Sequence, residues 1–267
     1  MKRAFLCLIT LMAVENVQAE ISCGDSPRSC GRLEGTRPAG PALEIRATTY
    51  NVQGWNWNDG KLAGAAQILA ETKPHIWGMQ EGNPIIIGQF TWLTSGYHRV
   101  DMETGAESIP LYWDSRLYHA YATGRAPLPQ TDAWQRGLTW AALIHRSTGY
   151  RVLAVNTHLA VNGAGVLQLD NLLATVDWTA AVARVHCIVL LGDFNLTASQ
   201  VSSILDRSYV ENIIAPASVD HVFARAQEGV VTVHDPVETP SYGSTDHTVI
   251  SSLVRCHPEA EEFPADH

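Results

Sequence analysis

Val189-Leu190-Leu191-Gly192-Asp193-Phe194-Asn195 is an apolar run that ends abruptly in Gly-Asp-Phe-Asn. The run is typical of a buried strand, and open α/β sheets place their chemistry at the carboxyl ends of such strands. Because side chains alternate along a strand, we expect Asp193 and Asn195 to project to the same side and hold one target together. Gly, Asp and Asn are also common turn residues, so the stretch taken alone is equally consistent with a turn.

The composition suits one large globular domain. The chain has 267 residues, and its apolar content of 46% is enough for a substantial core. The formal net charge of −9 argues against broad electrostatic capture of nucleic acid. It leaves room for a local basic groove, or for a metal ion that meets a phosphate.

The first 19 residues read as an export signal. A basic start at Lys2 and Arg3 precedes an apolar stretch from 4 to 14, which is too short to span a bilayer. Small residues up to Ala19 then offer a cleavage site, with a buried N-terminal helix as the alternative. We therefore expect a secreted protein, periplasmic or extracellular, with no transmembrane segment.

Four cysteines remain after the signal, and an even number in an exported chain suggests two disulfides. Cys23 and Cys30 lie in an irregular lead, residues 20–42, and are expected to close a local loop. Cys187 and Cys256 are expected to pair at the end of the core opposite the chemistry. Residues 257–267 form a C-terminal tail.

Strand signals outnumber helix signals along the rest of the chain. Strands are predicted at 43–50, 76–79, 109–113, 138–144, 151–156, 188–193, 219–224 and 248–254, and helices at 60–72, 166–176 and 197–205. Asp59 is expected to cap the first helix, and residues 82–108 are expected to be loop-rich. The antiparallel hairpin at 138–156 rules out a simple doubly wound parallel sheet.

Polar clusters mark the strand ends. They are Asn51, Gln80-Glu81, Asn156-Thr157-His158, Asp193-Phe194-Asn195, Asp220 and Ser244-Thr245-Asp246-His247. If they converge on one rim, the mixture suits metal-assisted hydrolysis of a phosphate ester. Oxygen ligands are appropriate to Mg²⁺, and histidines paired with acids can move protons.

In this order the clusters resemble the motifs of the endonuclease/exonuclease/phosphatase superfamily, over residues 43–255. The resemblance implies an α/β fold, a four-layer α-β-β-α sandwich with two packed mixed β-sheets, within one domain at residues 43–256. It also implies a metal-dependent hydrolase that acts on phosphate esters.

The resemblance further implies a role for each motif residue. Glu81 resembles the principal metal ligand, with Asn51 and Asp246 close to the ion or its waters. Asp193 and Asn195 resemble the pair that orients the attacking water and holds the phosphate.

Two acid–histidine pairs are implied in the same way. His247 with Asp220 resembles one catalytic pair, and His158 with Glu107 resembles the second pair, found in deoxyribonuclease-like members. Arg136 resembles a phosphate-contacting arginine.

The expected function is therefore a secreted phosphodiesterase that uses Mg²⁺, with Mn²⁺ or Ca²⁺ as alternatives. A deoxyribonuclease-like nuclease, or one resembling a toxin subunit, is favoured, with DNA as substrate. A sphingomyelinase-like phospholipase C acting on a lipid head group and a non-catalytic binding subunit on the same fold remain open. A partner subunit is possible in either case.

The aromatic residues and the other histidines give weaker signals. Trp55 and Trp57 either rim the cleft, where they would stack on bases or touch lipid, or pack inward. Trp113, Trp134 and Trp140 are expected in the core. The other histidines, His75, His98, His119, His145, His186 and His221, are expected to be structural or on the surface.

Overall fold

The computed structural model describes residues 41–257, apart from 57, 104–106, 132, 162, 206–207, 212–217, 228 and 240–244. The predictions for the signal peptide, residues 20–40, the Cys23–Cys30 pair and residues 258–267 lie outside these residues. No helix in the described part of the chain is long and apolar enough to cross a membrane.

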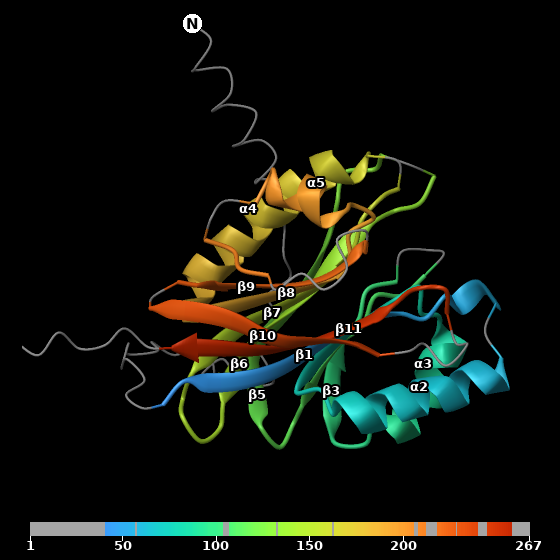
Figure 1. Ribbon diagram of the computed structural model, residues 1–267, viewed down its shortest axis with the longest axis horizontal. Coiled ribbons are helices and arrows are strands. Elements are labelled where there is room, and N and C mark those ends of the chain that lie inside the picture. The colour runs from blue at the N-terminus through green and yellow to red at the C-terminus, as the bar shows by residue number, and fades with distance from the viewer. Residues whose placement is uncertain are drawn as a thin grey trace, which may run out of the picture.

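Two β-sheets form the centre of the molecule (Figure 1). The first has the strand order β10-β11-β1-β2-β4-β3, with bounds Val230–Thr239, Val249–His257, Leu43–Asn51, Ile76–Gln80, Leu111–Asp114 and Tyr97–Val100. The second has the order β5-β6-β7-β8-β9, with bounds Tyr118–Pro127, Gly137–His145, Arg151–His158, Cys187–Asp193 and Asp220–Ala226. Each sheet is mixed, because β1 pairs with β2 and β7 with β8 in parallel while the other named pairs are antiparallel.

Helices cover the outer faces of the two sheets (Figure 1). The first sheet carries α2 (Asp59–Thr72) and α3 (Pro84–Leu93), and the second carries α4 (Gly165–Ala183) and α5 (Ala198–Ser202). The 3₁₀ turn η1 (Gly54–Asn56) links β1 to α2. The predicted four-layer α-β-β-α sandwich is confirmed.

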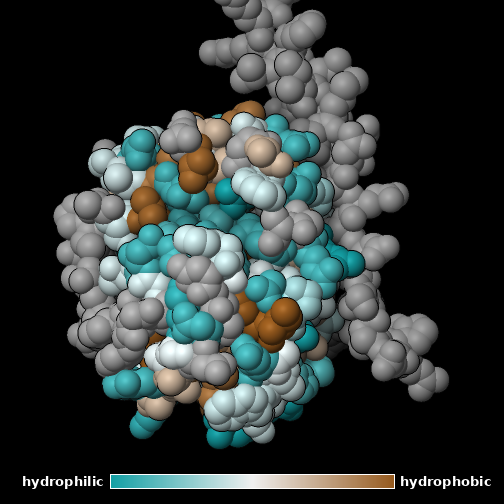
Figure 2. Space-filling model, turned by 90° about the vertical axis from the view of Figure 1, so that its right-hand side faces the viewer, coloured by the Kyte–Doolittle hydropathy of each residue, from teal (hydrophilic) through white to brown (hydrophobic). Residues whose placement is uncertain are grey.

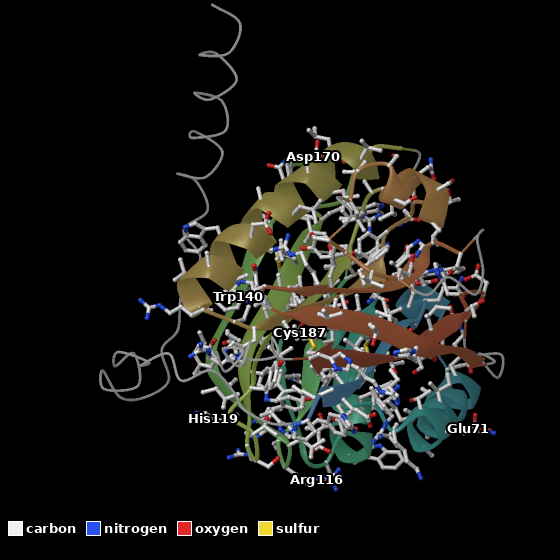
Figure 3. The ribbon with its side chains drawn as sticks, turned by 60° about the vertical axis from the view of Figure 1, so that its left-hand side comes forward. Glu71, Arg116, His119, Trp140, Asp170 and Cys187 are labelled. Atoms are coloured by element: carbon white, nitrogen blue, oxygen red, sulfur yellow. A yellow bond between two sulfur atoms is a disulfide. The ribbon has the colours of Figure 1, made fainter. Side chains whose placement is uncertain are left out.

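Three apolar layers hold the sandwich together. Ile45 of β1 and Val189 of β8 belong to the layer between the sheets. Trp77 lies between the first sheet and its helices, and Trp140 lies in the layer beneath α4 (Figure 3). All four side chains are buried, as expected when apolar faces of strands are withdrawn from water.

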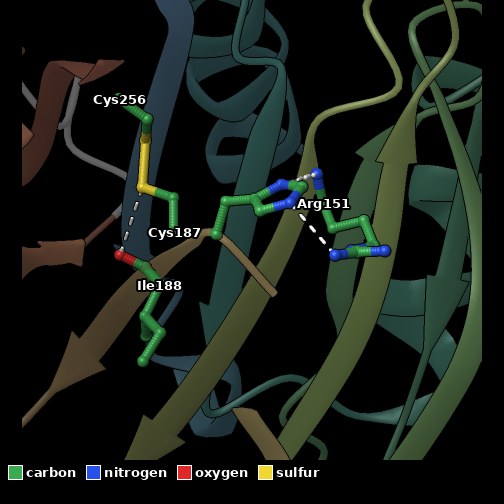
Figure 4. The surroundings of a disulfide bond; sticks show 5 residues. Arg151, Cys187, Ile188 and Cys256 are labelled. Atoms are coloured by element: carbon green, nitrogen blue, oxygen red, sulfur yellow. Dashed lines mark hydrogen bonds between the residues drawn. A yellow bond between two sulfur atoms is a disulfide. The ribbon is translucent and has the colours of Figure 1, made fainter. Parts of the chain in front are cut away.

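One covalent link joins the two sheets. Cys187 at the start of β8 and Cys256 near the end of β11 form a disulfide, with Cα atoms 6.2 Å apart (Figure 4). The bond lies at the opposite end of β8 from Asp193, so the predicted pairing and its predicted place are confirmed.

The structure differs from the predictions in several elements. Residues 82–108 contain α3 and β3, so the expectation of a loop-rich stretch was wrong. Asn83 caps α3, because its side chain accepts from the backbone N–H groups of Ile85 and Ile86 at 3.0 Å. Strands β5 and β10 were not predicted, and Asn58, not Asp59, caps α2 by accepting from the Lys61 N–H.

Candidate active site

The polar clusters converge on one rim of the sandwich. Strands β1, β2, β7 and β8 end at this rim, and β9 and β11 begin there, as their pairing registers show. The rim lies at the right-hand side of Figure 1. The fold therefore brings the polar clusters together, as the sequence predicts.

Asn51 is the centre of the cluster. Its fully buried amide nitrogen donates to Glu81 Oε1 at 3.1 Å and to Asp193 Oδ2 at 2.9 Å. It also lies 3.4 Å from Nε2 of His247. The side-chain oxygen accepts from the backbone N–H of Gln53 at 2.9 Å, which fixes the orientation of the amide. One carboxamide thus joins groups from four different strand ends.

Asp193 and Asn195 lie together, but not for the predicted reason. Strand β8 ends at Asp193, so Asn195 lies beyond it, in a turn with φ of 49°, and strand alternation does not apply. The Asn195 N–H donates to Asp193 Oδ1 at 2.9 Å, and its side-chain amide donates to the Leu159 carbonyl at 2.8 Å. The turn, favoured by Gly192 and Asn195, brings both side chains to the rim.

Close packing of β7 against β8 depends on Gly192. A Cβ at this position would lie 2.2 Å from the Thr157 carbonyl oxygen of the neighbouring strand. Only glycine permits that approach, which sets His158 at the end of β7 beside Asp193.

His158 is clamped between two carboxylates. Its Nδ1 lies 2.7 Å from Glu107 Oε2, and its Nε2 lies 3.5 Å from Asp193 Oδ2. Burial disfavours the charged ring, but Glu107 and then Asp193 outweigh it and raise the pKa of His158 above its usual value. The structure thus brings together the residues predicted as the second acid–histidine pair.

Arg136 completes this side of the site. Its Nη1 lies 3.2 Å from Glu107 Oε1 and 3.0 and 3.1 Å from the two ring nitrogens of His158. An atom so nearly equidistant from both nitrogens lies against the face of the ring. The pKa of Glu107 is lowered, because His158 and Arg136 overcome the opposing effect of burial.

The second pair lies across Asp193. His247 Nδ1 is 2.9 Å from Asp220 Oδ2 and 3.7 Å from Asp193 Oδ2. Burial lowers the pKa of His247, but the hydrogen bond and charge of Asp220 outweigh it and raise the pKa to about 9. Burial raises the pKa of Asp220 to about 6, and Oδ1 of this buried carboxyl has no hydrogen-bond partner within the described structure.

Asp246 lies at the outer edge of the cluster. Its side chain is 73% exposed, and its Oδ1 accepts from Gln53 Nε2 at 2.5 Å and lies 3.9 Å from His247 Nε2. Lys61 donates to Gln53 Oε1 at 3.4 Å. Burial lowers the pKa of Lys61, and the carboxylates of Asp246 and Glu81 oppose this effect without overcoming it. Asp246 is thus joined to the cluster through neighbours, whereas Glu81 contacts Asn51 directly.

Unusual backbone conformations accumulate at the rim. Five described non-glycine residues have positive φ, and two of them, Lys73 and Arg184, are ordinary helix C-caps. The other three are Gln53, Glu81 and Asn195, all at the site. Such conformations persist where the surrounding structure holds them, and they are concentrated at functional sites.

The donor atoms fit a divalent cation. The carboxylates of Glu81, which is half-buried, and Asp193, which is buried, meet at the single amide of Asn51, so two carboxylates lie close together. Asp193, Asp220 and His247 also present ligand atoms within 4.8 Å of one another, a grouping that the sequence did not predict. Hard oxygen donors of this kind suit Mg²⁺, Mn²⁺ or Ca²⁺.

A cleft of about 350 Å³ opens beside the cluster, lined by Gly54, Trp55, Glu81, Gly82, Asn83, Glu107, Trp134, Arg136 and His158. Figure 2 shows hydrophilic side chains gathered in a hollow on this face. Trp55 is 76% exposed and Trp134 is 54% exposed, so the expectation that Trp134 lies in the core was wrong. Trp113 and Trp140 are buried as expected, and Trp57 lies outside the described residues.

Comparison of sequences finds no match, either among protein-family models or among curated proteins. Comparison of structures does find matches. An endonuclease/exonuclease/phosphatase from Bacteroides vulgatus has a TM-score of 0.66 at 18% identity, covering 80% of this chain and 100% of that one. The catalytic domain of human Nocturnin, with bound sulfate, has a TM-score of 0.68 at 15% identity, covering 81% and 95%.

A third similar structure contains nucleic acid. TDP2 from D. rerio, complexed with single strand DNA product, has a TM-score of 0.67 at 16% identity, covering 79% of this chain and 98% of that one. At these identities the similarity establishes the fold. The chain has the endonuclease/exonuclease/phosphatase fold, which confirms at that level the resemblance found in its motifs.

Proposed function

We propose that this protein is a secreted, Mg²⁺-dependent phosphodiesterase of the endonuclease/exonuclease/phosphatase superfamily, with DNA as its substrate. The observation that carries the proposal is the placement of two acid–histidine pairs around one carboxylate. His158, held by Glu107, and His247, held by Asp220, both lie within 4 Å of Asp193 Oδ2. A protein that only bound a ligand would not need two such proton-handling pairs.

The metal requirement rests on the oxygen-rich cluster around Asn51. Glu81 would hold the ion, with Asn51 and Asp246 close to the ion or its waters, and the ion would supply polarisation of the phosphate and charge stabilisation of the departing oxygen. Mn²⁺ and Ca²⁺ offer the same coordination chemistry and are tested beside Mg²⁺.

The side chains perform the proton transfers. Asp193, with Asn195, orients the attacking water and accepts its proton as the water oxygen bonds to phosphorus. Each histidine contacts a carboxylate through Nδ1, and its Nε2 lies at the centre of the cluster, 3.5 Å from Asp193 Oδ2 for His158 and 3.4 Å from the Asn51 amide nitrogen for His247. Their raised pKa values favour imidazolium, and one Nε2–H donates its proton to the leaving oxygen while the other stabilises a phosphoryl oxygen. Arg136 adds a positive charge beside the cleft.

Secretion is part of the proposal. The Cys187–Cys256 disulfide supports an oxidising compartment, because such bonds persist mainly outside the cytosol. The deoxyribonuclease assignment is supported by the DNA-bound state of the similar TDP2 structure, which is a property of that protein.

The test is hydrolysis of single-stranded DNA, plasmid DNA, sphingomyelin and bis-p-nitrophenyl phosphate side by side, each with Mg²⁺ and with EDTA. We expect cleavage of DNA and of the small diester with Mg²⁺ and none with EDTA. Preferential cleavage of sphingomyelin would favour the phospholipase alternative. Absence of cleavage, together with absence of Mg²⁺ binding by calorimetry, would favour the binding-subunit alternative.

A further inference from the structure

Two tryptophans project into solvent at the cleft beside His158. Trp55 lies in η1, directly after β1, and Trp134 lies in the segment before β6. A tryptophan exposed to this degree leaves a large apolar surface in water, which carries a free-energy cost that burial against a ligand would remove. Both residues line the same cavity as His158 and Arg136, so a ligand in the cleft lies beside them.

Several polar groups of the cleft are engaged in hydrogen bonds within the protein. Glu107 uses both carboxylate oxygens, one with Arg136 and one with His158. Asn83 accepts from two backbone N–H groups of α3 and donates to the carbonyl of Gly54. The Gly82 backbone is paired in both directions with Ser108.

This pairing favours a ligand that stacks on the aromatic rings over one recognised by many hydrogen bonds. Recognition of a sugar requires hydroxyl groups to meet free donors and acceptors, and leaving such groups unpaired in a cleft is costly. A nucleobase offers a flat face that stacks on an aromatic ring whatever its edge pattern. The cavity, at about 350 Å³, is within the size range of pockets that take a ligand of nucleotide size.

We propose that Trp55 and Trp134 form a stacking subsite for an unpaired nucleobase next to the scissile phosphate, so that the substrate is single-stranded nucleic acid bound without sequence preference. The inference rests on the proposed function for the position of the phosphate. It also fits a chain of net charge −9, because stacking gives affinity for nucleic acid that does not depend on a broad positive surface.

The test is a binding measurement in EDTA, which needs no turnover. Fluorescence anisotropy follows a labelled single-stranded oligonucleotide and its abasic counterpart, which has the same length and charge but no bases. DNA and RNA versions are both used, because bases of either stack in the same way. The variants are Trp55→Ala and Trp134→Ala, with Trp92→Ala on α3 and Trp178→Ala on α4 as controls, since these tryptophans are also exposed but lie outside the cleft.

We expect the wild type to bind the base-bearing oligonucleotide more tightly than the abasic one. Each cleft variant should lose about five- to hundredfold in affinity for the base-bearing ligand and leave abasic binding unchanged. The control variants should match the wild type. Equal binding of the two ligands by the wild type, no measurable binding of either, or cleft variants that match the controls, would overturn the subsite. A wild type that discriminates bases but cleaves no diester with Mg²⁺ would instead refute the proposed function and leave the subsite standing.

Discussion

Asp193 lies between two histidines, each held by its own carboxylate, and this arrangement sets the charge of the site. Both imidazole rings are buried enough to favour neutrality, yet the neighbouring carboxylates overcome that effect and favour the charged ring. The site therefore places positive charge where a phosphoryl oxygen would arrive. The Nδ1 atoms carry the carboxylate contacts, which fixes the direction in which each Nε2 points.

Asp220→Asn tests this account of the charge. Without the carboxylate, burial of His247 is no longer outweighed, so the ring pKa should fall from about 9 toward or below the ordinary value near 6.5. NMR titration of the histidine rings in EDTA measures the shift. Glu107→Gln is the matched variant and should lower the pKa of His158 alone. A His247 pKa unchanged by Asp220→Asn would contradict the assigned pairing.

His186 gives a prediction about stability rather than catalysis. Burial, and then the nearby Arg151 guanidinium, lower its pKa to about 4, and the Arg151 backbone N–H donates to its Nδ1 at 3.0 Å (Figure 4). The folded state thus binds this proton more weakly than the unfolded chain, whose histidine titrates near 6.5. The stabilising contribution is complete above pH about 6.5 and is lost as the pH falls toward 4.

Denaturant unfolding at several pH values from 7.5 to 4 tests this direction of the pH dependence of stability. The free energy of unfolding of the wild type should fall more steeply with decreasing pH than that of His186→Gln, whose side chain does not titrate. Parallel curves for the two proteins would show that His186 is not held neutral.

Several site residues were predictable one by one, and others were not. The sequence identified His158, Asp193 and His247 because each lies at a strand end within a recognisable motif. Glu107 was implied only by the family resemblance, and the structure places it against His158. The exposure of Trp134 could not be predicted, since a tryptophan three residues before a strand has no pattern that separates core from cleft. The roles of the site residues remain predictions.

At the scale of elements, the strands that the sequence failed to predict share a position. β3, β5 and β10 are all edge strands of their sheets. An edge strand buries less of its surface, so its apolar pattern is weak, and β10 also carries a register shift and a proline. The interior strands β1, β7, β8 and β11 were predicted because their apolar runs are long. Helix α3 had a usable signal in Asn83-Pro84, a cap residue followed by proline at the first turn.

The packing of β2 against the second sheet can be tested at Gly78. A Cβ there would lie 2.2 Å from Leu191 Cδ1 and 2.3 Å from Asn156 Oδ1. Asn156 links the sheets by donating to the carbonyls of Met79 and Pro110, so Gly78→Ala would disturb that link. We expect a loss of about 1–3 kcal/mol in the free energy of unfolding.

Gly88→Ala is the matched control for that substitution. Gly88 is an exposed residue of helix α3, and a Cβ at this position would meet nothing within 4 Å. Alanine is the better helix former, so this variant should gain about 0.5–1 kcal/mol by the same denaturant measurement. If Gly78→Ala were as stable as Gly88→Ala, the close approach of the sheets would be refuted.

At the scale of the whole molecule, the disulfide connects the two sheets at the end remote from the site. Cys187 and Cys256 are separated by 69 residues, and a link of that span restricts the unfolded chain. Replacing both by serine should lower the free energy of unfolding by about 2–4 kcal/mol. Because the bond lies far from Asp193, hydrolysis per folded molecule should not change. Loss of activity without loss of stability would contradict this separation.

The fold class was predictable because the order of the motifs, rather than any single motif, carried the signal. The sandwich then brings residues as distant in sequence as Asn51 and His247 within 3.4 Å. The size and lining of the cleft could not be predicted from the sequence, because they depend on loops whose side chains have no periodic pattern.

We propose that His158 and His247 both act in phosphodiester hydrolysis. Turnover of a phosphodiester with Mg²⁺ by His158→Ala and His247→Ala is the most direct measurement of their roles. Each variant should lose about 10²–10⁴-fold in kcat while keeping the circular dichroism spectrum of the wild type. His119→Ala, which alters an exposed histidine on β5, should retain full activity. Near-normal hydrolysis by both correctly folded site variants would contradict the account.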